Sequence, residues 1–194
     1  MKNVILWIVI AIIFWNGGMP LMAQESLKEC GKVTFQGNPL TLLGNSVKVG
    51  DTAPDFTLLT TELKPLSLKE TKGVRILTTV PSLDTPVCDM QVRRFNQEAA
   101  KLPNVSIYAI SADLPFAQKR WCGGAGVDKL TTLSDHLSMG FAAAYGLYVK
   151  ELRLVARAVM VIDSTGKVVY RELVPEITQQ PDYDGALKAA KEAK

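Results

Sequence analysis

The chain has 194 residues, a length that suits one domain with its own hydrophobic core. Its formal net charge is +3 and no cluster of Lys and Arg accompanies that excess, so a nucleic-acid-binding face is not expected. Three Cys and one His are a poor ligand set for zinc, which takes about four N or S ligands, and no metal or other cofactor is predicted.

The first 23 residues have the pattern of a signal peptide or a membrane anchor. Residues 4–15 form an uninterrupted apolar run of 12 residues. A helix needs about 20 residues to cross a bilayer, so this run suits a signal peptide better than a membrane span. Cleavage is expected after Ala23, and an uncleaved anchor is the alternative. Under both interpretations the protein is periplasmic or otherwise exported. It is attached to a membrane only if the leader is uncleaved.

Residues 24–32 are predicted to be a linker that leads into one domain over residues 33–194. Cys30 falls in this linker, and we expect an exposed thiol that has no catalytic role and could pair between chains in an oxidising compartment. The domain is expected to open with a β-hairpin over residues 33–43 that turns at Gly37 and Asn38.

The rest of the domain is predicted to alternate strands with helices. The predicted elements are a short strand at 56–59, a strand at 74–80, a helix at 86–101, a strand at 105–110, a short helix at 115–121 closed by Gly123 and Gly124, a strand at 129–133, a helix at 135–144, a hairpin of strands 155–162 and 167–173, and a last helix at 184–193. The aromatic residues Phe116, Trp121, Phe141 and Tyr145 could line a pocket or fill core, and core is the better interpretation. This order fits a three-layer α/β sandwich of the thioredoxin type.

Cys88 is a candidate reactive thiol because it lies where the strand at 74–80 gives way to a helix. Asp84 or Thr85 can cap that helix through a side-chain oxygen, and Pro86 suits its first position. Cys88 then lies in the first turn, where unpaired N–H groups and the helix dipole favour a thiolate. The alternative is a small buried hydrophobic residue, which is the usual fate of a free cysteine.

Cys122 is the second candidate thiol, 34 residues after Cys88. No CxxC motif joins the three cysteines, which weakens a thioredoxin-like disulfide oxidoreductase as an interpretation. A reversible disulfide is the better interpretation of the pair. Arg157 stands out in an apolar run, where an unpaired guanidinium is costly. Its alternatives are an outward-facing residue or a structural ion pair, and Arg153 is the other arginine that could serve.

Five longer strings are distinctive. They are TFQGNPLTLLGN (34–45), PSLDTPVC (81–88), SADLPFAQKRWCG (111–123), LVARAVMVID (154–163) and EITQQPDYDGAL (176–187). Together they resemble the bacterial thiol peroxidase family, the Tpx-type, atypical two-cysteine branch of the peroxiredoxins. The likeness runs from about Val33 to the last residue. It implies a peroxiredoxin-type thioredoxin-like fold with an N-terminal β-hairpin.

The resemblance implies a role for each of five residues. Cys88 matches the peroxidatic cysteine, whose thiolate attacks a hydroperoxide and becomes a sulfenic acid, and Cys122 matches the resolving cysteine that condenses with it to an intrachain disulfide. Thr85 matches the hydroxyl of the family's Thr-x-x-Cys element, and Pro81 the residue that shields the thiolate from water. Arg157 matches the arginine that approaches the cysteine and the peroxide. Re-reduction by thioredoxin or a thioredoxin-like donor and a homodimer are also implied.

A redox sensor or disulfide-exchange protein that uses the same cysteine pair is the alternative function. Val80 stands where the family usually has an aromatic residue before the proline, which bears on substrate preference. The resemblance also implies that the Cys88 thiolate starts too far from Cys122 to form a bond, so disulfide formation is expected to need local unwinding of the helix that bears Cys88 and the segment that bears Cys122. His136 is expected at a helix start, as a surface or capping residue rather than a base.

Overall fold

The apolar run predicted as a buried strand forms the centre of the main sheet. Every residue of β5 (Val74–Thr79) is buried. It pairs parallel with β6 (Val105–Ser111) and antiparallel with β10 (Ala158–Ile162). The computed structural model describes residues 27–193. A central strand buried on both sides needs apolar cover on both faces of the sheet.

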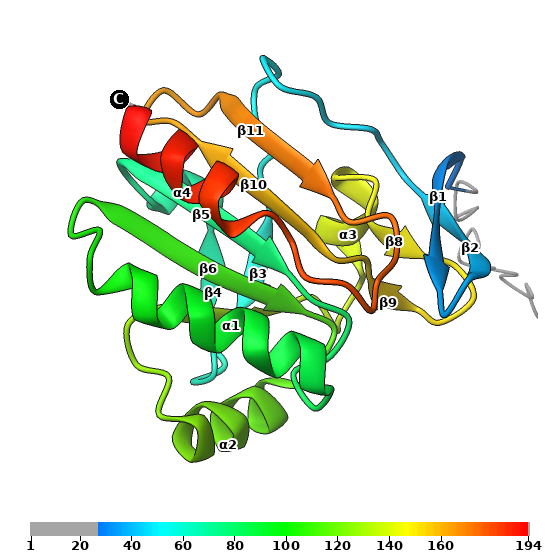
Figure 1. Ribbon diagram of the computed structural model, residues 1–194, viewed down its shortest axis with the longest axis horizontal. Coiled ribbons are helices and arrows are strands. Elements are labelled where there is room, and N and C mark those ends of the chain that lie inside the picture. Colours follow the sequence, from blue (N-terminus) through cyan, green and yellow to red (C-terminus); the bar gives the residue numbers. More distant parts are fainter. Residues whose placement is uncertain (1–26, 194) are drawn as a thin grey trace, which may run out of the picture.

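The main sheet has seven strands in the order β11-β10-β5-β6-β7-β3-β4 (Figure 1). Its other strands are β3 (Thr57–Leu59), β4 (Pro65–Ser67), β7 (Thr131–Ser134) and β11 (Val168–Leu173), and the 3-10 turn η1 (Leu68–Glu70) follows β4. The neighbours β5, β6 and β7 are parallel, so they end at one edge of the sheet. The segments that follow them therefore meet there, as is usual for ligand-binding edges of α/β sheets.

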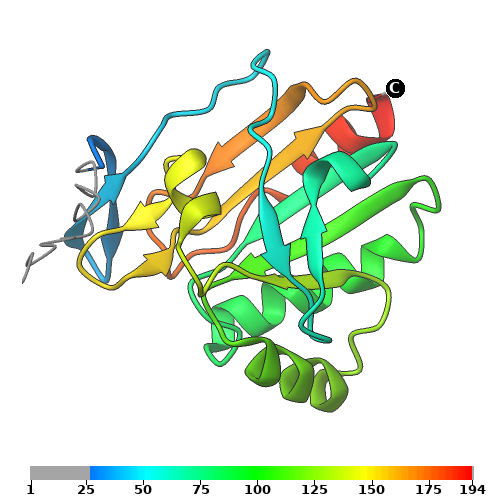
Figure 2. The same ribbon diagram turned by 180° about the vertical axis from the view of Figure 1, so that it is seen from behind.

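Helices cover both faces of this sheet. In Figure 1, α1 (Pro86–Ala99) and α4 (Tyr183–Glu192) lie on the near face, with α2 (Pro115–Ala125) beside α1. Figure 2 shows the opposite face, on which α3 (Gly140–Ala144) lies. This arrangement confirms the predicted three-layer α/β sandwich.

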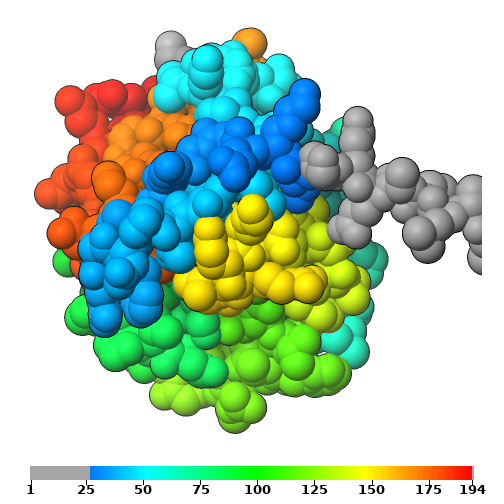
Figure 3. All heavy atoms as spheres, turned by 90° about the vertical axis from the view of Figure 1, so that its right-hand side faces the viewer, coloured from blue at the N-terminus to red at the C-terminus, as the bar shows by residue number. Residues whose placement is uncertain are grey.

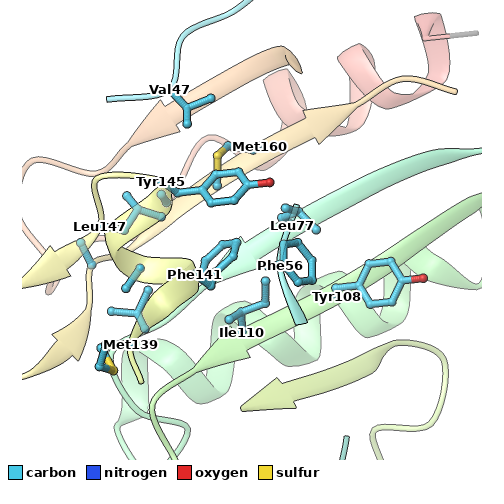
Figure 4. Close-up of a cluster of buried hydrophobic side chains, with 14 of the residues drawn as sticks. Val47, Phe56, Leu77, Tyr108, Ile110, Met139, Phe141, Tyr145, Leu147 and Met160 are labelled. Carbon is cyan, nitrogen blue, oxygen red and sulfur yellow. The ribbon is translucent and has the colours of Figure 1, made fainter. Parts of the chain in front are cut away.

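The core under α3 is built on aromatic side chains (Figure 4). The rings of Phe56 and Phe141 meet edge to face at 5.2 Å, and Phe141 stacks on Tyr145 at 4.5 Å. The Tyr145 hydroxyl donates to the Pro54 carbonyl at 2.6 Å, and burial raises the pKa of this phenol. Phe141 and Tyr145 thus fill core as predicted, whereas Phe116 is 64% exposed, so its assignment to the core was wrong.

The predicted N-terminal hairpin consists of β1 (Glu29–Phe35) and β2 (Asn38–Leu43). It forms a four-stranded sheet with β8 (Tyr148–Val149) and β9 (Leu154–Val155), in the order β1-β2-β8-β9. Figure 3 shows the blue hairpin packed beside the yellow segment that contains β8.

The hairpin begins earlier than predicted, so residues 29–32 belong to a strand rather than to the linker. Cys30 lies at an irregularity in the pairing of β1 with β2. It is half-buried and donates to the Gly146 carbonyl at 3.6 Å, and burial raises the pKa of its thiol. The prediction of an exposed thiol in a flexible linker was therefore wrong.

Helix α2 is longer than predicted. It runs to Ala125 and ends at Gly126, which has the left-handed conformation with φ 67° that glycine adopts readily. Gly123 and Gly124 lie inside the helix and do not close it. Cys122 is therefore a helical residue, which the predicted boundary had left outside.

The helix predicted at 135–144 is only the short α3. The Asp135 carboxylate accepts from the backbone N–H groups of Phe141 and Ala142, and the Asp135 carbonyl accepts from the Met139 N–H at 3.0 Å, which together fix the preceding turn. His136 lies in this turn, with its Nδ1 2.9 Å from the Ser134 hydroxyl, and not at a helix start.

The predicted leader over residues 1–23 lies outside the described part of the chain. Within residues 27–193, no helix has the length and apolar character that a membrane crossing requires.

Candidate active site

Cys88 lies in the first turn of α1, at the sheet edge where β5 ends. Its exposed fraction is 0%, and it packs with Val80, Leu83 and Val92. Pro81, the predicted shield, is also buried. Residues 88, 92 and 95 share one helical face, so the periodicity that anchors α1 on the sheet also turns the thiol inward.

The loop before Cys88 is held by Asp113, from the segment that follows β6. Its carboxylate accepts from the Ser82 hydroxyl at 2.7 Å and from the Leu83 N–H at 2.8 Å. The Ser111 hydroxyl donates to the same carboxylate at 2.8 Å. Two of the distinctive sequence strings are therefore joined directly by hydrogen bonds.

Thr85 is the residue that caps α1 by position, with extended backbone angles, and Pro86 fills the first helical position as predicted. The predicted capping bond is absent, because the Thr85 hydroxyl donates to the Ser82 carbonyl at 3.0 Å. Thr85 is exposed, so its hydroxyl stands at the outer side of the site.

Arg157 is buried, with 1% of its surface exposed, in the break between β9 and β10. Its Nη2 donates to the Cys88 sulfur at 3.2 Å, its Nε donates to the Ile177 carbonyl at 2.9 Å, and its Nη1 donates to the Gln91 side-chain oxygen. Arg157 forms no salt bridge with a carboxylate of residues 27–193. A guanidinium at this distance stabilises negative charge on the sulfur.

The outward-facing and ion-pair alternatives for Arg157 are thus wrong. So is the choice of Arg153, which is exposed. The predicted strand at 155–162 is split, because the Thr79 hydroxyl donates to the Ala156 carbonyl at 2.6 Å and accepts from the Ala158 N–H at 2.9 Å. These two hydrogen bonds of the Thr79 hydroxyl fix the backbone on both sides of Arg157.

Gln91 was not predicted as a site residue. It is fully buried, and its amide nitrogen donates to the Thr78 hydroxyl at 2.6 Å and to the Thr79 carbonyl at 3.3 Å. With its nitrogen fixed in this way, its oxygen faces Arg157. The available signal was its position three residues after Cys88, which places both on one helical face.

Cys122 is half-buried in α2, and its sulfur lies 3.6 Å from the Thr132 hydroxyl. Burial raises the pKa of this thiol, more than the Thr132 contact lowers it. Cys122 lines a groove of about 350 Å³ together with Thr60, Glu62, Lys119 and Thr132. Both cysteines are free thiols, and Cys122 packs against the same small apolar cluster in which Cys88 is buried.

In the part of the chain that the structure describes, no three His, Cys, Asp or Glu side chains gather as a metal site would require. The chemistry that the arrangement supports is that of a buried sulfur nucleophile beside a fixed cationic donor.

Comparison with known proteins decides the family. The Redoxin family matches residues 48–187. The thiol peroxidase of Bacillus subtilis is 59% identical over 161 residues, which are 82% of this chain and 96% of that protein. The chain belongs to the thiol peroxidase family. The thiol peroxidase of Clostridium acetobutylicum is likewise 51% identical over 163 residues, which are 84% of this chain and 99% of that protein.

Solved structures agree with this assignment. A peroxiredoxin-like protein from Aquifex aeolicus matches with a TM-score of 0.78 and 40% identity, covering 84% of this chain and 98% of that one. A thiol peroxidase from Chromobacterium violaceum has a TM-score of 0.77 at 21% identity, over 85% of this chain and 98% of that one, which shows the shared fold. The family and the thioredoxin-like fold of the peroxiredoxin type are thereby confirmed, and the protein is a thiol-dependent peroxidase.

Proposed function

We propose that this thiol peroxidase reduces hydrogen peroxide and organic hydroperoxides through Cys88, with Cys122 as the resolving thiol. The observation that carries the proposal is the 3.2 Å contact from the buried Arg157 guanidinium to the Cys88 sulfur. A buried cation without a carboxylate partner is costly unless negative charge forms beside it. A thiolate supplies that charge before the reaction, and the leaving oxygen supplies it during the reaction.

In the proposed first step, the Cys88 thiolate attacks the terminal oxygen of ROOH. The S–O bond forms as the O–O bond breaks, and RO⁻ takes a proton to leave as ROH. Charge develops on the leaving oxygen, so a donor fixed nearby lowers the barrier. Arg157 is such a donor, and the exposed Thr85 hydroxyl can turn from the Ser82 carbonyl towards a bound peroxide. Pro81 keeps bulk water from the sulfur.

In the second step, the Cys122 thiol attacks the Cys88 sulfenic acid, which gives the disulfide and releases water. Both cysteines are helical and free in this structure. We propose that α1 and α2 unwind locally to bring the two Cα atoms within the distance of about 7 Å that a disulfide needs. Thioredoxin or a thioredoxin-like protein would then reduce the disulfide.

A homodimer and an exported or periplasmic location are also proposed. The homodimer rests on the family resemblance, and the location rests on the apolar pattern of residues 4–15. Gel filtration with light scattering, and fractionation of cells with detection of the processed chain, test these two points.

The central test uses the full reduced chain, which has three thiols, and one equivalent of cumene hydroperoxide. We expect rapid loss of two thiols, no rapid loss in Cys88→Ser, and a Cys88 sulfenic acid trapped by dimedone in Cys122→Ser. Thioredoxin, its reductase and NADPH should sustain turnover. Oxidation no faster than that of an ordinary free thiol would refute the peroxidase assignment of Cys88 and favour the disulfide-exchange alternative.

A further inference from the structure

Helices α1 and α2 are joined by one group of side chains next to both cysteines. The Trp121 indole N–H donates to the Asp89 carboxylate at 3.0 Å. The Arg93 Nε donates to both oxygens of that carboxylate, at 3.0 and 2.9 Å. The Arg93 Nη1 donates to the Ala125 carbonyl at 2.6 Å. We refer to Asp89, Arg93, Trp121 and the Ala125 carbonyl as the interhelical latch.

The latch lies where the second step of the reaction needs movement. Asp89 directly follows Cys88, and Trp121 directly precedes Cys122. The Arg93 guanidinium also lies 5.8 Å from the centre of the Trp121 ring, within cation–π range. Its contact with Ala125 places a cation on a carbonyl of the last turn of α2, where a positive charge stabilises a helix. Cys122 therefore cannot leave α2 freely while the latch is closed.

Helix α2 contributes little stability of its own in this turn. Gly123 and Gly124 are exposed and follow Cys122 inside the helix, and glycine is the poorest helix former after proline. A Cβ added at either position would meet no atom within 4 Å. The Gly126 that ends the helix needs its left-handed backbone, but neither packing nor a left-handed backbone demands glycine at 123 or 124.

We propose that the latch and the Gly123–Gly124 pair set how the Cys88 sulfenic acid divides between two fates. This inference rests on the proposed function of the two cysteines. In one fate, Cys122 leaves the unwound turn and forms the disulfide with release of water. In the other, a second ROOH oxidises the sulfenic acid to a sulfinic acid and leaves as ROH. The glycines favour unwinding, and the latch restrains it.

Strengthening the turn should therefore promote over-oxidation. In Gly123→Ala and Gly124→Ala, each alanine favours the helix, so the ratio of sulfinic acid to disulfide should rise by about fivefold per substitution. Loosening the latch should do the opposite. In Arg93→Gln, the same ratio should fall by about twofold, the effect of losing a partly exposed ion pair.

Arg94 offers a matched control for Arg93. It is the next residue on α1 and also pairs with a carboxylate four residues away, Glu98 at 3.2 Å in place of Asp89. Its contacts in the described chain are with Glu98 on α1 and with the Tyr183 ring of α4, whose centre lies 6.0 Å from the guanidinium, rather than with α2. Arg94→Gln removes the same charge from the same helix, and the ratio of sulfinic acid to disulfide should stay that of the native chain.

The experiment treats each full-length, reduced chain with a rising excess of cumene hydroperoxide and measures disulfide and sulfinic acid by intact-mass spectrometry. Unchanged ratios in both alanine variants would overturn the proposal, as would equal shifts in the two arginine variants. A native chain that forms neither product would instead show that the proposed function of Cys88 is wrong. Rapid Cys88 oxidation in every variant, with ratios shifted as stated, would support the proposal.

Discussion

Arg157 keeps a positive charge in the protein interior without a carboxylate partner among the described residues. Its Nε and Nη1 are held by the Ile177 carbonyl and the Gln91 side chain, both of which are neutral. These contacts fix the orientation of the guanidinium without cancelling its charge. The charge therefore remains available to the Cys88 sulfur and to whatever oxygen approaches that sulfur.

Replacing this donor should slow the first chemical step. We expect Arg157→Gln to lower the second-order rate constant of Cys88 oxidation by about a hundredfold, as the loss of a fixed donor to a developing charge usually does. Stopped-flow mixing with hydrogen peroxide measures this constant. Arg153→Gln removes an exposed arginine from the same segment and should leave it unchanged. A small effect at Arg157, or a similar effect at both positions, would contradict the assigned role.

Sequence alone could predict the site residues whose signal is local. Cys88 lies beside a strand, a proline and a helix start, and Arg157 interrupts an apolar run. Asp113 gave no such signal and Gln91 gave only its spacing of three residues from Cys88, because their partners lie on other elements. Gln91 contacts β5, and Asp113 contacts the loop that follows β5. A buried polar residue of this kind is recognised only when the fold supplies its partners.

At the scale of elements, Glu176 joins the N-terminal hairpin to the segment after β11. Its carboxylate accepts from the Gly37 N–H at 3.0 Å and the Thr34 hydroxyl at 2.8 Å in the hairpin. It also accepts from the Thr178 hydroxyl at 2.6 Å in its own segment. The Thr178 hydrogen bond, which is the largest cause, and the hairpin donors together lower the pKa of Glu176 to about 2. The ionised form of Glu176 therefore helps to hold the hairpin against this segment.

Acid should weaken the contact between the hairpin and the segment after β11. The pKa of Glu176 is lower in the folded chain than its ordinary value of 4.5. Its contribution to stability is therefore full above about pH 4.5 and is lost as the pH falls towards about 2. We expect the melting temperature to depend less on pH across this window in Glu176→Gln than in the native chain. Parallel melting curves for the two chains would contradict this role of Glu176.

Among the helices and strands, as among the site residues, those with a local sequence pattern could be predicted and those without one could not. The strand at 74–80 and the helix after Pro86 follow from apolar runs and a helix-start signal. The two-residue strands β8 and β9 exist because β8 pairs with β2 and β9 pairs with β8, so no local pattern marks them. The sequence predicts the end of α2 at Gly123 and Gly124 because glycine is common at the ends of helices. The residue that adopts the left-handed conformation is Gly126, which only the backbone reveals.

At the scale of the whole molecule, the fold brings the loops after β5 and β6 to one edge and joins them there. Asp113 ties the Cys88 loop to the segment that leads into α2, and the interhelical latch ties α1 to the end of α2. The reduced chain is therefore organised around separate thiols. The proposed disulfide would break part of this organisation, while β5, β6 and β10 would have no need to move.

Oxidation should consequently loosen two short segments and leave the sheet intact. We expect faster amide hydrogen exchange at residues 86–91 and 118–126 in the disulfide form than in the reduced form, with exchange in β5 and β10 unchanged. Hydrogen exchange followed by mass spectrometry of peptides measures both regions. Cys122→Ser treated with one equivalent of peroxide carries the oxidised Cys88 but no disulfide, and it should keep the reduced pattern. Protection retained in both helices of the disulfide form would mean that the cysteines meet without unwinding, and the latch would then have no movement to restrain.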